Sequence, residues 1–288
     1  MITYPNVKVN LGLNVLRRRP DGYHDIETLF VPYFGMTDIL EIVPSELFSI
    51  EITSSKPGIP DWNPMSDLCA KAWRLMNGRF GVPPVAISLE KRNPVGGGLG
   101  GGSSDGAFTL KMLNEMFSVG LSEAELASLA AELGSDCPFF IHNRPMIGEG
   151  RGEILSDFPL SGIDFSGSGA HSGGYGARPS LPETPSSEKS PADGLSVRYR
   201  LGVIALDSSL KVSTAQAYRS ITPAVSPVSL RDALSHDITQ WRGLLKNDFE
   251  PVISAAHPLV RETIESCYAR GCVYAAMSGS GPSVFYIS

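Results

Sequence analysis

A run of glycines followed by two serines and an aspartate contains the residues best suited to bind an anion. Residues 96–102 hold six glycines and one leucine. An alternating apolar segment at 85–89 precedes them and predicts a strand, and the helical spacing of apolar residues from Ala107 to Phe117 predicts a helix after them. The first N–H groups of a helix lack intrahelical partners, and glycine lets the backbone approach a phosphate closely. The pattern therefore predicts a phosphate-binding loop, with N-cap residue types at 103–105.

The same glycines fit two other nucleotide motifs less well. Gly96, Gly98 and Gly101 satisfy the spacing of a dinucleotide-binding fingerprint. A dinucleotide-binding domain has an acidic residue about twenty positions after this fingerprint, at the end of a second strand. Here Glu123 and Glu125 instead fall within a helical pattern at 122–133. No Gly-Lys-Ser/Thr triplet follows the glycines, which argues against a Walker loop. For these reasons a nicotinamide-dependent dehydrogenase is a weaker hypothesis than a protein that binds another phosphate ligand.

Composition limits the class of protein. The chain has 288 residues, 42% of them hydrophobic, which favours two domains over one. A net charge of −6 argues against a nucleic-acid surface, so the few cations near the loop, Lys8, Lys91 and Arg92, become candidates for phosphate contacts. The four cysteines lack the spacing of a metal site or a disulfide scaffold. No apolar run approaches the roughly 20 residues of a membrane span, and we expect a cytoplasmic protein with no membrane partner.

The elements that must position these residues alternate along the chain. Residues 7–15 predict a half-buried strand with Lys8, Asn10 and Asn14 on one face. Further strands are expected at 28–34, 39–43, 199–206 and 273–277, and a helix at 67–77. Glycine, serine and proline dominate 166–194, a composition that buries too little apolar surface to order itself. We therefore predict an N-terminal nucleotide-binding domain at 1–160, a flexible insertion at 161–198 and a C-terminal domain at 199–288.

Five separated segments resemble one family. The loop Pro94–Ser104 is similar to the Pro-x-x-x-Gly-Leu-Gly-Gly-Ser-Ser loop of the GHMP small-molecule kinases. Within that superfamily, the segments at 7–11, 19–24, 133–140 and 277–282 resemble those of the 4-diphosphocytidyl-2-C-methyl-D-erythritol kinases. The resemblance implies an α+β, two-domain GHMP kinase fold. Its N-terminal domain is like ribosomal protein S5 domain 2, its C-terminal domain is a ferredoxin-like α/β sandwich, and the active site lies in the cleft between them.

The activity that this resemblance implies is ATP-dependent phosphorylation of the 2-hydroxyl group of 4-diphosphocytidyl-2-C-methyl-D-erythritol, in the non-mevalonate route to isoprenoid precursors. Asp136 matches the aspartate that accepts the proton of the hydroxyl group, and Lys8 matches the lysine beside it. Tyr23 and His24 match the residues that stack on cytosine and hydrogen-bond its edge, Asn10 matches a further substrate contact, and Tyr218 is a loosely matched second aromatic wall.

The resemblance also implies the nucleotide contacts. Magnesium is expected to arrive with ATP, near the side chain of Ser104. Two aspartates, Asp67 and Asp105, stand where the family commonly has asparagine, which replaces an amide donor with an acceptor. The expected ATP-binding positions are Lys91, Pro94, Val95, Gly96, Gly97, Gly98, Leu99, Gly100, Gly101, Gly102, Ser103, Ser104 and Asp105.

The partners expected are therefore ATP and a small cytidyl substrate, with a monomer or a weak homodimer in solution. Another GHMP kinase, acting on homoserine, mevalonate or a sugar, is an alternative. A non-catalytic nucleotide-binding paralogue is another.

Overall fold

A computed structural model of the chain describes residues 1–54, 63–167, 198–206, 210 and 212–288. Contacts divide it into two compact units that alternate along the chain. The first comprises Met1–Val7, Met36–Val95 and Gly100–Arg144, and the second comprises Lys8–Gly35, Gly96–Leu99 and Pro145–Ser288. The units alternate because strands β2 (Asn6–Arg18) and β3 (His24–Thr37) each run from one unit into the other. This division differs from the predicted domain boundaries after residues 160 and 198, which stay predictions.

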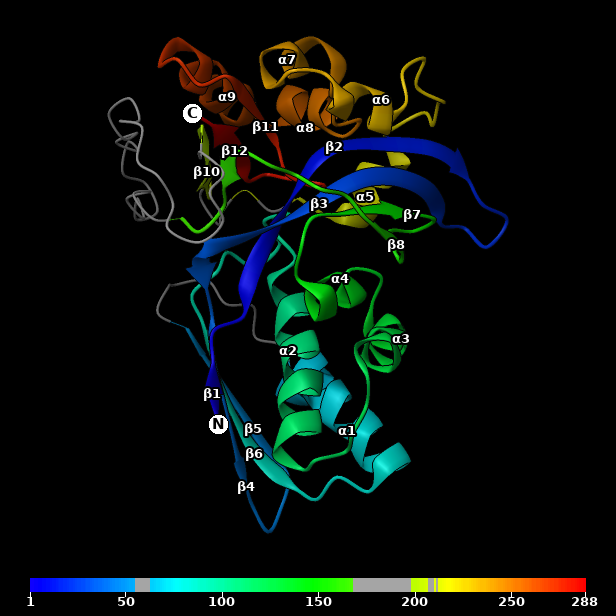
Figure 1. Cartoon of the computed structure of the whole chain (residues 1–288), viewed down its shortest axis with the longest axis vertical. Helices are drawn as coiled ribbons and strands as arrows, with labels where there is room; N and C mark the ends of the chain where they lie inside the picture. The colour runs from blue at the N-terminus through cyan, green and yellow to red at the C-terminus, as the bar shows by residue number, and fades with distance from the viewer. Residues whose placement is uncertain (55–62, 168–197, 207–209, 211) are drawn as a thin grey trace. The chain divides into compact units, whose positions relative to one another are not determined.

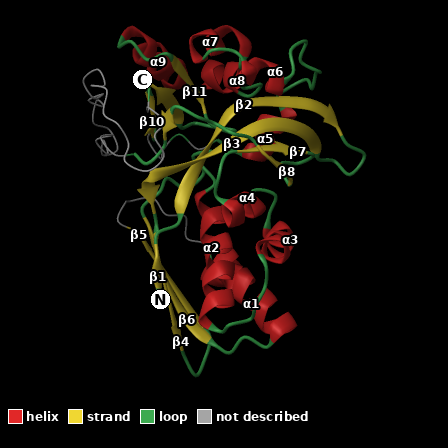
Figure 2. Ribbon diagram, viewed as in Figure 1, coloured by secondary structure: helices red, strands yellow, loops and turns green. Residues whose placement is uncertain are grey.

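The first unit is a four-stranded sheet with helices along one side (Figures 1 and 2). The strand order is β1-β4-β6-β5, and only the β5–β6 pair is parallel. Helix α1 begins after Asp67, whose side chain accepts the Cys69 N–H, and ends at Gly81 with φ 67°. Ser122 and Glu125 form a capping box at the start of α3. The elements of this unit are β1 (Ile2–Thr3), β4 (Ile39–Pro44), β5 (Ser49–Ser54), a 3-10 turn (Pro64–Ser66), α1 (Leu68–Phe80), β6 (Val85–Lys91), α2 (Gly101–Met116), α3 (Glu123–Leu133) and α4 (Cys137–His142).

The second unit contains two four-stranded sheets, with orders β2-β3-β7-β8 and β11-β12-β10-β9. Helices α7, α8 and α9 lie together beside β11 in Figure 1. Its further elements are β7 (Met146–Glu149), β8 (Ile154–Asp157), β9 (Ile163–Asp164), β10 (Tyr199–Ile204), α5 (Thr214–Arg219), α6 (Leu230–Ser235), a 3-10 turn (Ile238–Gln240), α7 (Trp241–Leu244), α8 (Glu250–Ala256), α9 (Pro258–Ala269), β11 (Tyr274–Met277) and β12 (Val284–Ile287).

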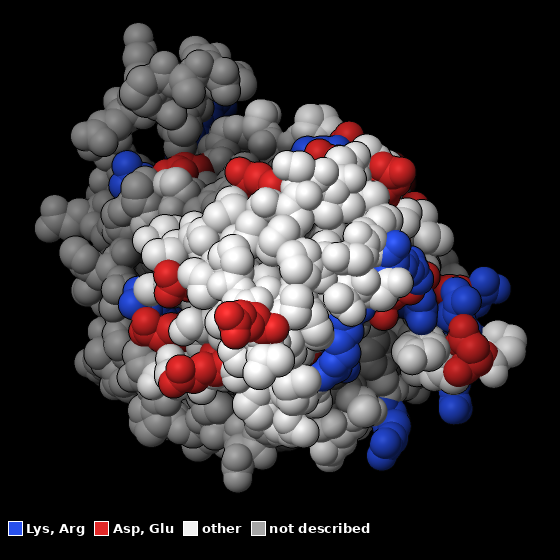
Figure 3. Space-filling model, turned by 90° about the horizontal axis from the view of Figure 1, so that it is seen from below, with Lys and Arg blue, Asp and Glu red and all other residues white. Residues whose placement is uncertain are grey.

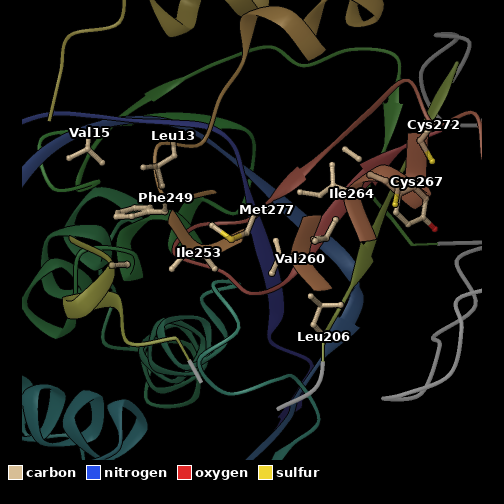
Figure 4. Close-up of a cluster of buried hydrophobic side chains, with 14 of the residues drawn as sticks. Leu13, Val15, Leu206, Phe249, Ile253, Val260, Ile264, Cys267, Cys272 and Met277 are labelled. Atoms are coloured by element: carbon tan, nitrogen blue, oxygen red, sulfur yellow. The ribbon is translucent and has the colours of Figure 1, made fainter. Parts of the chain in front are cut away.

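The core of the second unit joins strand β2 to the C-terminal helices and strands (Figure 4). Leu13 and Val15 of β2 share it with Phe249, which is 1% exposed, and with Met277 of β11. Strand β2 is tied to the same region by the Leu13 N–H, which donates to the Lys246 carbonyl at 2.8 Å. Burial of this cluster therefore fixes the course of the strand that carries Lys8 and Asn10.

Strand β2 differs from its expected half-buried form. Residues 6–15 are all buried, so the polar side chains of the strand are enclosed as well as the apolar ones. This is tolerated because the polar side chains have partners inside the protein, as Asn10 does with Thr28 and Asn14 with Glu27. The alternating pattern predicted the strand, but it does not show that the polar side chains of the strand are covered.

Helix α2 begins earlier than its N-cap residue types suggest. It starts at Gly101 after an N-cap at Gly100, whose φ is 72°, and no side chain caps it. The candidate N-caps were wrong: Ser103, Ser104 and Asp105 lie inside the first turn and a half. Glycine reaches this left-handed conformation without strain, so the glycine loop itself supplies the turn into the helix.

The predicted insertion at 161–198 lies, from residue 168 to residue 197, outside the described residues. At its two ends, β9 pairs in parallel with Tyr199 and Arg200 of β10. The Phe34 N–H also donates to the Phe165 carbonyl at 3.0 Å. Within the described residues, no helix has the length and apolar character needed to cross a bilayer.

Candidate active site

The glycine loop brings backbone N–H groups to the start of α2. Gly96, Gly98 and Gly100 have φ angles of 76°, 75° and 72°, a region that favours glycine. The first intrahelical bond from the Ser104 N–H reaches the Gly100 carbonyl at 3.0 Å, so the N–H groups of the preceding turn point out of the helix end. Gly102 is exposed, and a Cβ there would meet nothing within 4 Å. The predicted phosphate loop therefore has the backbone geometry of an anion site.

In the second unit, the middle of this loop packs against the C-terminal glycine turn. Ser278 Oγ donates to the Gly98 carbonyl at 3.1 Å, and the Ser283 N–H donates to the Gly97 carbonyl at 3.2 Å. A Cβ on Gly98 would lie 2.3 Å from the Ser278 carbonyl oxygen. Glycine is required at this position because the two backbones approach too closely for any side chain.

A buried asparagine holds the C-terminal turn in place. Asn247 Nδ2 donates to the carbonyls of Met277 and Gly279, both at 2.8 Å, and its Oδ1 accepts the Phe249 N–H at 2.9 Å. No motif in the sequence marks Asn247, because the two carbonyls of the turn that it holds lie about thirty residues away.

Lys8 lies on a polar network in the same unit. Its Nζ donates to Asn10 Oδ1 and lies 3.5 Å from the Gly98 carbonyl oxygen. Asn10 Nδ2 in turn donates to Thr28 Oγ1 at 3.0 Å, and its N–H donates to Ser278 Oγ at 3.2 Å. Lys8 is 4% exposed. The network fixes the ammonium group beside the glycine loop and brings together the predicted residues Lys8 and Asn10, with Thr28 as an unpredicted support.

Of the predicted base-binding residues, His24 and Tyr218 contact each other and Tyr23 lies apart from them. His24, at the start of β3, stacks on Tyr218 of α5 with ring centroids 4.8 Å apart and planes 20° apart. Tyr23 is 57% exposed, and its ring lies 5.1 Å from the guanidinium carbon of Arg151. Burial and then the charge of Arg18 lower the pKa of His24, so its imidazole is neutral near pH 7 and offers one donor and one acceptor.

Asp136 occupies the N-cap position of α4, yet its carboxylate makes no capping hydrogen bond. The Ser135 hydroxyl lies 3.5 Å from its Oδ1. The next residue, Cys137, is hydrogen-bonded to Ser103 in the first turn of α2, and burial raises the pKa of its thiol to about 12. Within the first unit, this contact places the start of α4 beside the start of α2, where the phosphate loop ends.

Lys91 is enclosed by two carboxylates. Its Nζ contacts Asp38 Oδ2 and Asp105 Oδ2, and the three residues are 4%, 0% and 0% exposed. Burial would lower the pKa of Lys91, but the charges of Asp105 and Asp38 outweigh it and raise that pKa. Burial raises the pKa of Asp105 to about 8 despite the opposing charge of Lys91, and Asp38 adds to the rise. One ammonium thus balances one carboxylate, and the other carboxyl group is protonated near neutral pH.

Arg92, Asp67 and Asp38 lie near the loop or at the start of a neighbouring helix. The Arg92 guanidinium pairs with Glu90 at 2.8 Å, and Asp67 caps α1. The sequence did not point to Asp38, because a lone acid before a strand matches no motif. Figure 3 shows Lys and Arg mixed with Asp and Glu among the described residues of one face, without a continuous basic band.

The chain matches the family model for the GHMP kinases N terminal domain over residues 67–144, and the model for GHMP kinases C terminal over 229–288. A 4-diphosphocytidyl-2-C-methyl-D-erythritol kinase of Bacteroides thetaiotaomicron is 39% identical over 99% of this chain and 91% of its own length. A protein with the same name from Cytophaga hutchinsonii is 37% identical over 100% and 92%.

Solved structures agree with these relatives. A crystal structure of 4-(cytidine 5'-diphospho)-2C-methyl-D-erythritol kinase matches with a TM-score of 0.68 and 28% identity, over 100% of this chain and 90% of that one. The homoserine kinase of Cytophaga hutchinsonii shares the fold, with a TM-score of 0.59 and 15% identity over 99% and 85%. The predicted two-domain GHMP kinase fold is confirmed, and ATP is the co-substrate that a kinase of this kind uses. The chain belongs to the 4-diphosphocytidyl-2-C-methyl-D-erythritol kinase family within the GHMP kinases.

Proposed function

We propose that the chain transfers the γ-phosphoryl group of ATP to the 2-hydroxyl group of 4-diphosphocytidyl-2-C-methyl-D-erythritol, giving the 2-phosphate and ADP. The relatives' shared name supports this substrate, and the residue chemistry supports the reaction. The protein must position donor and acceptor and neutralise developing charge, because phosphoryl transfer needs little covalent chemistry from side chains. The step belongs to the non-mevalonate route to isoprenoid precursors.

The stacked pair of His24 and Tyr218 is the main structural observation that favours a cytidyl substrate. It joins an aromatic face to a neutral imidazole. Cytosine offers a π-face together with donors and acceptors on its edge, so it can use both features. Homoserine and mevalonate have no ring to use them. Tyr23, exposed at the neighbouring position, supplies the stacking face in this proposal, and Asn10 supplies a polar contact.

Asp136 and Lys8 perform the catalytic roles. Asp136 accepts the proton of the 2-hydroxyl group as its oxygen bonds to the γ-phosphorus of ATP and the bond to ADP breaks. Lys8 stabilises the negative charge on the attacking oxygen, and its contacts with Asn10 and the Gly98 carbonyl orient the ammonium before substrate binds.

The loop from Pro94 to Ser104 binds the phosphates of ATP through its N–H groups, and magnesium accompanies the nucleotide. The described residues contain no cluster of three His, Cys, Asp or Glu side chains able to hold a metal ion. The Ser104 hydroxyl is buried and has no hydrogen-bond partner among the described residues, so it can make one further contact. When bound, magnesium neutralises charge on the phosphate oxygens, and Ser104 is the side chain that would hold it. A cytoplasmic location also stays a prediction.

The proposal is tested by ADP release coupled to NADH oxidation, with the cytidyl substrate, homoserine and mevalonate supplied in turn. We expect release only with the cytidyl substrate. Asp136→Asn and Lys8→Ala are each expected to lower kcat by about a hundredfold or more. Glu132→Gln, which changes an exposed carboxylate paired with Arg79, is the matched control and keeps full activity. Full activity in Asp136→Asn would remove the assigned base.

The role of His24 is tested separately. His24→Ala should raise KM for the cytidyl substrate and leave KM for ATP unchanged, because the ring contacts only the acceptor in this proposal. An equal rise in both constants would contradict the base-binding role. ATP binding by calorimetry without turnover on any of the three alcohols would favour the non-catalytic paralogue instead.

A further inference from the structure

The buried cluster of Asp38, Lys91 and Asp105 links the two ends of the phosphate loop within the first unit. Lys91 is the last residue of β6, immediately before the loop, and Asp105 lies in α2, immediately after it. Asp38 Oδ1 accepts the N–H groups of Arg92 and Asn93, at 2.6 and 2.7 Å, while its Oδ2 contacts Lys91. The residues that enter and leave the loop therefore share one set of charge-assisted hydrogen bonds.

We propose that Lys91, held between Asp38 and Asp105, is a positioning residue that sets the spacing between the loop entry and the first turn of α2, and so aims the loop's N–H groups at the phosphates of ATP. This inference rests on the proposed use of the loop for ATP. It gives Lys91 a role through the fold, where the family resemblance suggested direct contact with the nucleotide.

Three observations favour positioning over direct contact. Lys91 is 4% exposed, and its ammonium already contacts two carboxylates. A Cβ added to Gly101 would lie 3.8 Å from Lys91 Nζ and 3.8 Å from Asp38 Oδ2, so the cluster packs directly under the first residue of α2. A charge-assisted network in the protein interior is rigid when its members have good geometry, and a small displacement of a binding loop is costly.

Asp105→Leu and Asp105→Asn separate positioning from direct contact. Leucine removes the link to α2 while leaving the balanced pair of Lys91 and Asp38, and asparagine keeps an oxygen that can accept from Lys91. We expect Asp105→Leu to weaken binding of a non-hydrolysable ATP analogue by about tenfold to a hundredfold, measured by calorimetry, and Asp105→Asn to stay within about twofold of wild type. Asp105→Leu should also raise KM for ATP while KM for the cytidyl substrate stays unchanged.

Two other results would contradict the positioning role or the proposed function. If Lys91 contacts the nucleotide directly, Asp105→Leu frees its ammonium and binding of the analogue stays equal or becomes tighter, which overturns the inference. Wild-type protein that fails to bind the analogue would instead overturn the proposed function. Arg79→Met, which breaks an exposed ion pair with Glu132, is the control for a general loss of stability.

Hydrogen exchange on the wild-type protein gives a test that does not depend on a variant folding. The N–H groups of Arg92 and Asn93 should exchange slowly without nucleotide, because both donate to the fully buried Asp38. Exchange of these two groups as fast as that of exposed loop amides would show that the cluster does not hold the loop entry, and would also overturn the inference.

Discussion

Asp105→Asn is expected to stabilise the protein by an amount that grows as the pH rises. In the folded chain, burial raises the pKa of Asp105 from 3.8 to about 8, so the folded protein keeps a proton that the unfolded chain releases. Stability from this group is therefore fully present below about pH 4 and is lost as the pH rises through about 8. Asparagine cannot ionise, and its oxygen can still accept a hydrogen bond from Lys91.

The size of the effect follows from that raised pKa. Each pH unit between the unfolded and folded pKa values costs the wild type about 1.4 kcal/mol of unfolding free energy relative to the variant. From about pH 5 to about pH 8 the difference should grow by about 4 kcal/mol, and above that it should level off. The physical cause is a single ammonium, Lys91, that balances only one of two buried carboxylates.

The assay is urea unfolding of both proteins across this pH range at constant ionic strength. Glu132→Gln, which changes a half-exposed carboxylate paired with Arg79, is the matched control and should follow the wild-type curve at every pH. Parallel curves for wild type and Asp105→Asn would refute the reasoning, because they would mean that Asp105 binds the same number of protons in the folded and unfolded states.

Two further predictions concern the loop and the core. The Gly98→Ala variant should have a kcat/KM for ATP about tenfold or more below that of the Gly96→Ala variant. Both glycines have positive φ, but of the two only a Cβ at position 98 meets the Ser278 carbonyl oxygen, at 2.3 Å. Equal losses in the two variants would argue against the close backbone approach. Phe249→Ala should lower the unfolding free energy by about 3 to 5 kcal/mol in urea, since Phe249 is 1% exposed. Val225→Ala, at a side chain 80% exposed, should change it by about 0.5 kcal/mol or less, and a similar loss in both would contradict the assigned core.

Local patterns predicted the elements whose signals are local. The helical pattern at 122–133 predicted α3, and the alternation at 85–89 predicted β6, because helical and strand periodicity depend only on near neighbours. The start of α2 was misplaced because serine and aspartate are good N-cap types, while the loop supplies the required turn at Gly100. The enclosure of β2 was missed because burial of a polar face depends on distant partners such as Thr28.

The sequence by itself determined the glycine loop, the family and the kind of reaction, since these depend on residues adjacent in the chain and on motifs repeated among relatives. Only the tertiary structure placed Asp38 against Lys91, 53 residues away, and stacked His24 on Tyr218. These contacts form because packing brings together segments whose spacing along the chain carries no signal. Tertiary packing thus decided that Lys91 lies between two buried carboxylates and that His24 has an aromatic partner.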